Sequence, residues 1–184
     1  MIVLLNGLSR SGKDTVAALF ETHGFVHKKI SAHVKNVVCA MFGLSAEELE
    51  DDRKDLVNKE YLVTPRDLMK FVGTHVGQYE VQRVLPSMGR TLWIRRLLRD
   101  LHRDQHYVIS DYRFPHEYIT LQQRFPSVPV VRVRVEPAFP GFVPPNTLDE
   151  TEMPLAYDHV LHNRALRQLS VDVDVLVKKI LLNK

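Results

Sequence analysis

The glycine-rich loop near the start of the chain constrains its fold more than any other feature. An apolar run at 2–5 is followed by Gly7-Leu8-Ser9-Arg10-Ser11-Gly12-Lys13, and helix-like spacing of apolar residues begins after Thr15. A strand, a glycine turn and a helix in this order direct backbone N–H groups and the positive end of the helix dipole toward one point. A polyphosphate binds at such a point, and the lysine adds its charge there. The motif therefore predicts a phosphate-binding loop (P-loop) in an α/β fold.

The loop residues divide into phosphate ligands and a metal ligand. We expect a nucleoside triphosphate with Mg²⁺ to be held by Gly7, Ser9, Arg10, Ser11, Gly12, Lys13, Asp14 and Thr15. A serine or threonine usually follows the P-loop lysine and binds Mg²⁺. Here Asp14 takes that place and the hydroxyl comes one residue later, so we assign the metal to Thr15. The alternative is a turn that joins strand to helix and binds nothing.

Composition limits the class of protein. The 184 residues, 45% hydrophobic and 26% charged, suit one globular domain with small insertions. The net charge of +3 fits an anionic small substrate as well as nucleic acid. The single cysteine, Cys39, excludes an internal disulfide and suits a reducing compartment. No run reaches the ~20 apolar residues of a membrane span and no signal peptide is recognised, so we expect a cytoplasmic protein without membrane contact.

Strand and helix patterns alternate along the chain, which favours a three-layer α/β fold with a parallel sheet. Strands are expected at 2–6, 25–30, 107–110, 128–135 and 158–161. Helices are expected at 13–22, at 31–41, from 64 onward, and at 90–104, 114–125 and 164–182. The proline-rich stretch 136–152 is too long for a simple connection in a compact domain, and such a loop is typical of a lid or a binding loop.

Asp111 follows the strand expected at 107–110. Ligands bind at the carboxyl ends of strands in open parallel sheets, and in P-loop proteins an acid there helps to hold Mg²⁺. We therefore assign Asp111 to the metal, together with Thr15, and Arg113 to a second phosphate. The alternative is an Asp111–Arg113 ion pair that caps the helix beginning at Pro115.

Phosphoryl transfer needs cationic groups around the developing charge. The candidates are Lys13, Arg10, Arg66, Arg113, Arg132 and Arg134. Arg66 lies in the first turn of a helix opened by Thr64-Pro65, where backbone N–H groups also favour a phosphate. The alternative for Arg66 is a solvated surface charge. Arginines that alternate with valines on a strand, as Arg132 and Arg134 do, often only face water.

The middle of the chain offers candidates for binding a nucleobase. An aromatic ring and a glycine turn with accessible backbone suit a base, which points to Trp93, Gly73 and Thr74. The alternative for Trp93 is a place in the hydrophobic core. No pair of histidines has an evident third ligand, so we do not expect a zinc site.

These motifs together resemble the phage- and virus-type deoxynucleoside monophosphate kinases. The matching segments, in the same order as in that family, are GLSRSGKDT, TPRDLMKFVGTHVGQ, the LW of the following helix, YVISDYRFPHE, DETE and DHVLHN. The resemblance implies a nucleoside monophosphate kinase-like fold with a five-stranded parallel core, a helical acceptor-binding region at about 31–104 and a short lid at about 136–152. It also implies transfer of a phosphoryl group from ATP, with Mg²⁺, to a deoxynucleoside monophosphate.

The resemblance implies roles for individual residues. Gly7, Gly12, Lys13 and Thr15 match the P-loop, and Asp111 and Arg113 match the acid and arginine of the catalytic cleft. On the acceptor side the matching residues are Arg66, Gly73, Thr74 and, after the lid, Glu152. Asn163 and Arg164 would border the base of ATP. Relatives suggest a homodimer, and a viral source would place the protein in the host cytoplasm.

Two positions depart from the family pattern. The family commonly has an acid after the Gly-Thr step and an arginine three places later, where this chain has His75 and Gln78. Either a different base is preferred, or Arg83 or Arg90 replaces the lost charge. The lid segment also contains no Arg or Lys, so we expect it to exclude water rather than to supply charge.

Two other functions are consistent with the residues. Animal-type phosphomevalonate kinase shares the GKD loop, the S-D-x-R strand end and the T-x-E pattern, but lacks the R-D-L…G-T helix. A non-catalytic nucleotide-binding module could contact nucleic acid through the arginines of 90–103. Those arginines more simply form a solvated helix face, so we do not expect nucleic acid as a partner.

Overall fold

The computed structural model describes residues 1–142 and 155–182, and the chain divides into two compact units. Unit 1 comprises Met1–Lys29 and Leu101–Lys184, and unit 2 comprises Ile30–Asp100. Unit 2 therefore interrupts the sequence of unit 1. Its bounds lie close to the helical region expected at 31–104, whose acceptor-binding role stays a prediction.

Unit 1 is built on a five-stranded parallel sheet in the order β2-β3-β1-β4-β5. Its strands are β1 (Ile2–Asn6), β2 (Val26–Lys28), β3 (Tyr107–Ile109), β4 (Val130–Pro137) and β5 (His159–Asn163). Its helices are α1 (Lys13–Glu21), α6 (Pro115–Arg124) and α7 (Leu166–Leu182). The expected three-layer α/β fold with a parallel five-stranded sheet is thus confirmed.

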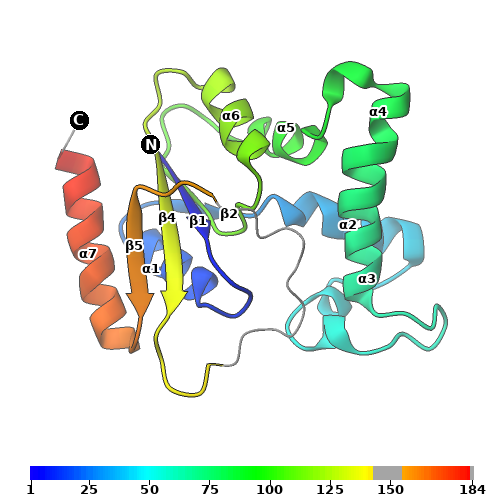
Figure 1. The fold of residues 1–184 in the computed structure, drawn as a ribbon, viewed down its shortest axis with the longest axis horizontal. Helices are drawn as coiled ribbons and strands as arrows, with labels where there is room; N and C mark the ends of the chain where they lie inside the picture. Colours follow the sequence, from blue (N-terminus) through cyan, green and yellow to red (C-terminus); the bar gives the residue numbers. More distant parts are fainter. Residues whose placement is uncertain (143–154, 183–184) are drawn as a thin grey trace. The chain divides into compact units, whose positions relative to one another are not determined.

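The strand that leads into the P-loop occupies the centre of this sheet (Figure 1). In β1, Ile2 lies opposite Tyr107 of β3 on one side and Val130 of β4 on the other. Its four apolar residues are at most 2% exposed. Val3 and Leu5 pack in one cluster with residues of α1 and α7, and the other two lie on the opposite face of the pleat. A strand covered on both faces needs this continuous apolar run.

Unit 2 is helical. Its elements are α2 (Ser31–Phe42), the 3-10 turn η1 (Glu47–Leu49), the 3-10 turn η2 (Arg53–Asp55), α3 (Pro65–Lys70), the π-helix η3 (Phe71–Glu80), α4 (Val81–Val84), the 3-10 turn η4 (Pro86–Met88) and α5 (Leu92–Leu98). Its core joins α2 to α3 and η3 through residues such as Val38, Leu68 and Val72. The capping box that opens α3 is present, because Thr64 and Asp67 each accept a hydrogen bond from the other's backbone N–H.

The helix expected from Thr64 changes its hydrogen-bonding pattern at Phe71, where α3 gives way to the ten-residue π-helix η3. The Trp93 ring lies against the backbone of Gly77, where a Cβ atom would come within 2.2 Å of the indole nitrogen. That nitrogen donates a hydrogen bond to the carbonyl of Gly73 at 2.8 Å. Long π-helical segments are rare and often mark functional sites.

One expected helix is shorter than the sequence indicated. A helix at 90–104 was expected, but α5 ends at Leu98. The later residues turn toward β3, where the amide of His102 donates to the hydroxyl of Tyr107 at 2.9 Å. This contact between side chain and backbone competes with continued helix. Among the described residues, no helix combines the length and apolar character needed to cross a bilayer.

Candidate phosphate-binding site

The P-loop has the backbone that its glycines predict. The φ angles are +150° at Gly7, +62° at Arg10 and +97° at Gly12. A Cβ atom on Gly7 would lie 2.3 Å from the carbonyl oxygen of Val135, and one on Gly12 would lie 2.2 Å from Nδ2 of Asn163. Both glycines are therefore required by close approach, and Gly12 also by its left-handed backbone.

Lys13 is held by the loop that precedes it. Its Nζ donates hydrogen bonds to the carbonyl oxygens of Gly7 at 2.7 Å and Leu8 at 2.6 Å. The lysine charge is thus kept beside the loop amides. Ser11 is fully buried, and its Oγ has no hydrogen-bond partner within the described part of the chain. A loop that concentrates N–H groups, a hydroxyl and an ammonium group in one place is suited to phosphate oxygens.

Asn163, which follows much later in the sequence of unit 1, is hydrogen-bonded to the P-loop backbone. Its Nδ2 donates to the carbonyl oxygen of Ser11 at 3.0 Å, although the two residues lie 152 positions apart. The family resemblance assigned Asn163 and Arg164 to the border of the ATP base. The structure brings Asn163 to the loop backbone and leaves Arg164 exposed directly after β5. Their contact with a base stays a prediction.

Asp14, at the position where a hydroxyl is usual, belongs to a polar network that the sequence did not indicate. Its Oδ1 accepts from Oγ of Ser110 at 2.8 Å and its Oδ2 accepts from Nζ of Lys29 at 2.9 Å. Nε2 of His27 lies 2.7 Å from the same Ser110 oxygen. Since the hydroxyl proton points to Asp14, we assign the donor in this last contact to His27.

Charges in this network shift two pKa values. Burial alone would raise the pKa of Asp14, but hydrogen bonds from Lys29 and Ser110 and the Lys29 charge outweigh it and leave the pKa below the ordinary value. Burial and the charge of Lys29 lower the pKa of His27. At neutral pH, Asp14 is therefore an anion and His27 a neutral donor. His27 of β2 and Lys29 of the following loop reach Asp14 only in the folded chain, so local sequence patterns could not connect them with it.

Asp111 and Arg113 lie where the sequence placed them, directly after β3. Asp111 is half-buried and Arg113 is exposed. Tyr112, between them, is tied to β1, because its N–H donates to Leu5 at 3.2 Å and its carbonyl accepts from the Asn6 side chain at 3.1 Å. The two side chains on either side of Tyr112 are thus carried by a backbone joined to the central strand.

The residues assigned to Mg²⁺ suit that ion chemically. Thr15 and Asp111 offer oxygen atoms. The residues that precede them in the sequence, Asp14 and Ser110, are hydrogen-bonded to each other. Mg²⁺ commonly binds through one or two protein oxygens and completes its shell with phosphates and water. No cluster of three or more acidic, histidine or cysteine ligands occurs within residues 1–142 and 155–182, and a magnesium–nucleotide site does not need one. The metal assignment stays a prediction.

Arg132 has a different set of partners from the one expected of a catalytic arginine. Its Nη2 and Nε donate to the two carboxylate oxygens of Asp158 at 2.7 and 3.1 Å, and its guanidinium lies 4.7 Å from the centre of the Tyr118 ring. The Asp158 hydrogen bond raises the pKa of Arg132 further. Arg134 likewise pairs with Glu136 at 3.1 Å. These contacts favour structural roles for both arginines.

In unit 2, the proposed acceptor residues lie on three elements, α3, η3 and α5. Arg66, on α3, forms a two-pronged ion pair with Asp55, in which its Nη2 lies 2.9 Å from Oδ2. Gly73 and Thr74 lie on η3, and the ring of Trp93 is partly buried against the core of this unit. Whether these residues bind an acceptor stays a prediction.

Gln78, which stands where the family commonly has an arginine, is hydrogen-bonded to an arginine from elsewhere in unit 2, Arg90. Gln78 is 5% exposed, and its Oε1 accepts from Nε and Nη2 of Arg90 at 3.0 and 2.7 Å. The Arg90 guanidinium also lies 5.1 Å from the centre of the Tyr79 ring. Arg83 pairs with Glu80 at 3.0 Å instead. Of the two arginines that could replace the lost charge, Arg90 is therefore the one beside Gln78.

Several expectations fall in other places. Glu152 and residues 143–152 of the expected lid lie outside the described residues. Ser9 and Arg10 are exposed on the loop.

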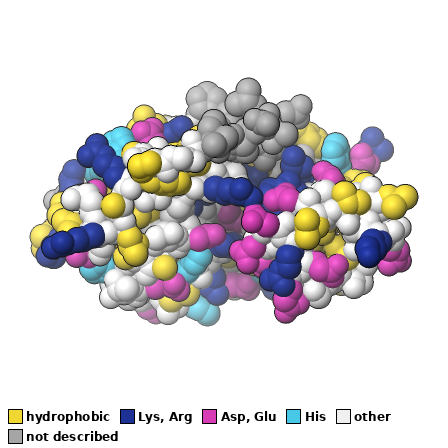
Figure 2. All heavy atoms as spheres, turned by 90° about the horizontal axis from the view of Figure 1, so that it is seen from below, with side chains coloured by type: hydrophobic (Ala, Val, Ile, Leu, Met, Phe, Trp, Pro, Cys, Tyr) yellow, Lys and Arg dark blue, Asp and Glu magenta, His cyan; other side chains and the backbone are white. Residues whose placement is uncertain are grey.

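On the face drawn in Figure 2, Lys and Arg side chains lie among Asp and Glu side chains. In α5, Arg96 pairs with Asp100 at 2.8 Å, as expected of a solvated helix face.

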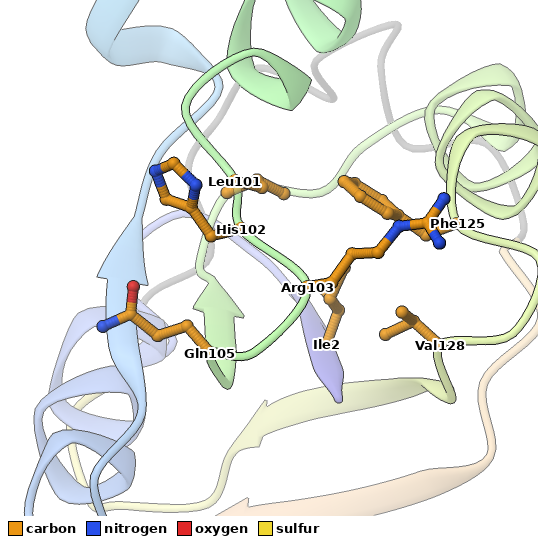
Figure 3. Close-up of a pocket in the computed structure, with 7 residues that line it drawn as sticks. All are labelled: Ile2, Leu101, His102, Arg103, Gln105, Phe125 and Val128. Atoms are coloured by element: carbon orange, nitrogen blue, oxygen red, sulfur yellow. The ribbon is translucent and has the colours of Figure 1, made fainter.

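A hollow in unit 1 lies away from these residues (Figure 3). It is lined by Ile2, Leu101, His102, Arg103, Gln105, Phe125 and Val128. Ile2 begins β1, whereas the P-loop follows its last residue, so the hollow is at the opposite edge of the sheet. It contains no space for a water-sized molecule. We therefore place the candidate site at the P-loop.

Comparison with known proteins shows a likeness of fold. No family model and no curated protein matches the sequence. Among solved structures, a putative kinase from Chloroflexus aurantiacus is similar, with a TM-score of 0.53 and 12% identity over 100% of this chain and 97% of that chain. A gluconokinase from Sinorhizobium meliloti has a TM-score of 0.50 and 14% identity over 99% and 96% of the two chains. A sugar kinase from Janibacter sp. has a TM-score of 0.50 and 15% identity over 96% and 94%. The chain therefore has the fold of P-loop kinases.

Proposed function

We propose that this protein transfers the γ-phosphoryl group of ATP, in the presence of Mg²⁺, to a deoxynucleoside monophosphate and so forms the diphosphate. The observation that carries the proposal is the P-loop of unit 1. Its glycines let the loop backbone pack closely against Val135 and Asn163, and Nζ of Lys13 lies on the loop carbonyls. The kinase-like fold supports phosphoryl transfer, and the sequence resemblance supports the acceptor.

The proposed roles follow from charge and position. Lys13 and the loop amides bind the outer phosphates of ATP, and Thr15 and Asp111 hold Mg²⁺, which offsets the phosphate charge. Arg113 and Arg10 stabilise the charge that develops during transfer. The attacking phosphate oxygen is already an anion, so the reaction needs alignment and charge rather than a general base. Arg66 and the η3 residues are the proposed acceptor ligands of unit 2.

A coupled assay of ADP release tests this proposal. We would supply ATP and Mg²⁺ with each deoxynucleoside monophosphate in turn and, separately, with phosphomevalonate. We expect turnover with at least one deoxynucleoside monophosphate and none with phosphomevalonate. Lys13→Ala should lower kcat/KM by roughly 100-fold or more, because it removes a charge that stabilises the transition state. Lys178→Ala removes an exposed lysine from α7 and should leave activity unchanged.

The same assay identifies the other functions. Turnover with phosphomevalonate alone would change the acceptor and retain the reaction. Tight binding of MgATP without turnover of any acceptor would indicate a nucleotide-binding module. A Lys13→Ala variant as active as the wild type would remove the basis of the proposal.

A further inference from the structure

The segment that carries Asp111 and Arg113 has no regular structure of its own. Residues 111–114 lie between β3 and α6 and belong to neither. Outside helices and strands, backbone conformation depends on individual hydrogen bonds. The precision of the two proposed active-site side chains therefore depends on what holds this segment.

The segment is held at two places. Tyr112 is bound to β1, as described above. The next two amides, of Arg113 and Phe114, both donate to Oε2 of Glu117 at 2.8 and 2.9 Å. One carboxylate oxygen on the first turn of α6 thus fixes the backbone of Arg113 itself.

The placement of Glu117 exceeds what a helix cap requires. A glutamate at the third helical position commonly accepts the N–H of the N-cap residue, here Phe114. Glu117 also accepts the N–H of Arg113, one residue before the cap. Glu117 is only 7% exposed, and burying a carboxyl group is costly unless its hydrogen bonds compensate. Burial raises its pKa to about 8, against the two backbone hydrogen bonds, and the nearby Asp111 raises it further while Arg113 lowers it.

We propose that Glu117 is a positioning residue, which holds the Arg113 backbone so that Arg113 and Asp111 present their side chains together to the phosphates and metal. The roles of those two side chains rest on the proposed function. Glu117 itself touches neither substrate nor metal in this scheme. What matters is the place of one acceptor oxygen, and the charge of the group is secondary.

Two substitutions separate oxygen position from charge. Glu117→Gln cannot ionise at any pH but can put its amide oxygen in the place of Oε2 and accept both N–H groups. Glu117→Asp keeps a carboxylate but withdraws it by one methylene. We expect Gln to retain kcat within about threefold and Asp to lose roughly 10- to 100-fold, since a misplacement of about 1 Å can cost that much. The KM for ATP should change little in either variant, because the Lys13 contacts are independent of Glu117.

A double-variant cycle tests whether the effect passes through Arg113. Arg113→Ala combined with Glu117→Asp should be no slower than Arg113→Ala alone, within about threefold. Glu48→Ala is the matched control. Glu48 also accepts a backbone N–H three residues before it, that of Ser45 at 2.9 Å, but lies on η1 of unit 2. We expect Glu48→Ala to leave kcat unchanged.

Hydrogen exchange keeps this inference separate from the proposed function. The amides of Arg113 and Phe114 should exchange at least about tenfold faster in Glu117→Asp than in the wild type or Glu117→Gln. Unchanged exchange would overturn the inference, whatever the enzyme does. Faster exchange with undiminished kcat in Glu117→Asp would overturn it as well, and so would additive losses in the cycle. Wild-type protein inactive toward every acceptor would refute the proposed function, while the exchange result would still decide whether Glu117 holds this segment.

Discussion

At Gly12, the space that a side chain would fill is taken by the amide of Asn163. We predict that Gly12→Ala raises the dissociation constant for MgATP by tenfold or more, because the added methyl group must displace either the loop or Asn163. Titration calorimetry measures this. Gly24→Ala is the control, since Gly24 also has a positive φ, +81°, but has nothing within 4 Å of the added atom. It should lose about 1–2 kcal/mol of stability from backbone strain and keep its nucleotide affinity. Equal affinity losses in the two variants would contradict the prediction.

For Arg132, we predict a loss of stability with little loss of catalysis. Arg132→Ala removes two charge-assisted hydrogen bonds to Asp158 and should cost roughly 1–3 kcal/mol of unfolding free energy, while kcat stays within a few-fold of the wild type. Denaturant unfolding and the ADP-release assay measure the two effects.

Asp158→Ala provides the comparison for Arg132. It should cost a similar amount of stability, and the double variant should cost less than the sum of the two single variants. If Arg132→Ala abolishes turnover and Asp158→Ala does not, Arg132 has the catalytic role that the sequence suggested.

The two arginine positions show why residue roles were harder to predict than the P-loop. The loop is local, because close glycines and a lysine determine its backbone and its charge. Arg66 was selected by its charge and its place in a first helical turn, and Arg132 by its charge. Their partners Asp55 and Asp158 lie 11 and 26 residues away in the sequence. The same reason hid the bond from Asn163 to Ser11, which spans 152 residues.

Among the elements, strands were easier to predict than the geometry of one helix. All five strands were expected within about two residues of their observed ends, and apolar or alternating runs marked β1, β3 and β4. The π-helix η3 could not be predicted, because its apolar spacing also suits an α-helix. Its Gly77 gives the Trp93 ring access to the backbone, and Gly73 supplies the acceptor for the indole N–H. Both contacts depend on α5, which follows η3 in the chain.

A pair of glycine substitutions tests this account of η3. Gly77→Ala would place its Cβ 2.2–2.7 Å from three atoms of the Trp93 ring, which is not a flexible end. We expect it to destabilise unit 2 by about 1–3 kcal/mol. Gly73→Ala would meet only Val34, at 3.4 Å, and should be neutral or gain up to ~1 kcal/mol from helix propensity. Trp93 is the single tryptophan, so its fluorescence during denaturation reports directly on the unfolding of unit 2. Similar stabilities for the two variants would refute the packing argument.

For the molecule as a whole, Glu117 predicts a pH dependence of stability. Its folded pKa of about 8 exceeds the value of 4.5 for an unperturbed glutamate. The native state therefore binds the extra proton between these values, and the contribution of Glu117 to stability is full below about pH 4.5 and lost as the pH rises to about 8. We expect the melting temperature of Glu117→Gln, relative to that of the wild type, to increase from pH 5 to 8. Above pH 8 the difference between the two proteins should stay constant.

Calorimetric scans across this range check the expected trend. The pKa values of His27 and His159 are lowered by burial. Both histidines are present in both proteins, so their contributions to the pH dependence cancel in the comparison. A constant difference between the two proteins from pH 5 to 8 would show that Glu117 does not titrate there.

The interruption of unit 1 by unit 2 also sets an order of events on the ribosome. β1 leaves the ribosome well before its two neighbours in the sheet, because β3 and β4 are encoded after residue 100. At usual elongation rates the central strand waits on the order of 10 s for them. During that interval the apolar run Ile2–Leu5 has neither neighbouring strand to pair with, while the helical insertion is being made. The nascent chain must keep this water-averse segment from associating with other chains until β4 has been made.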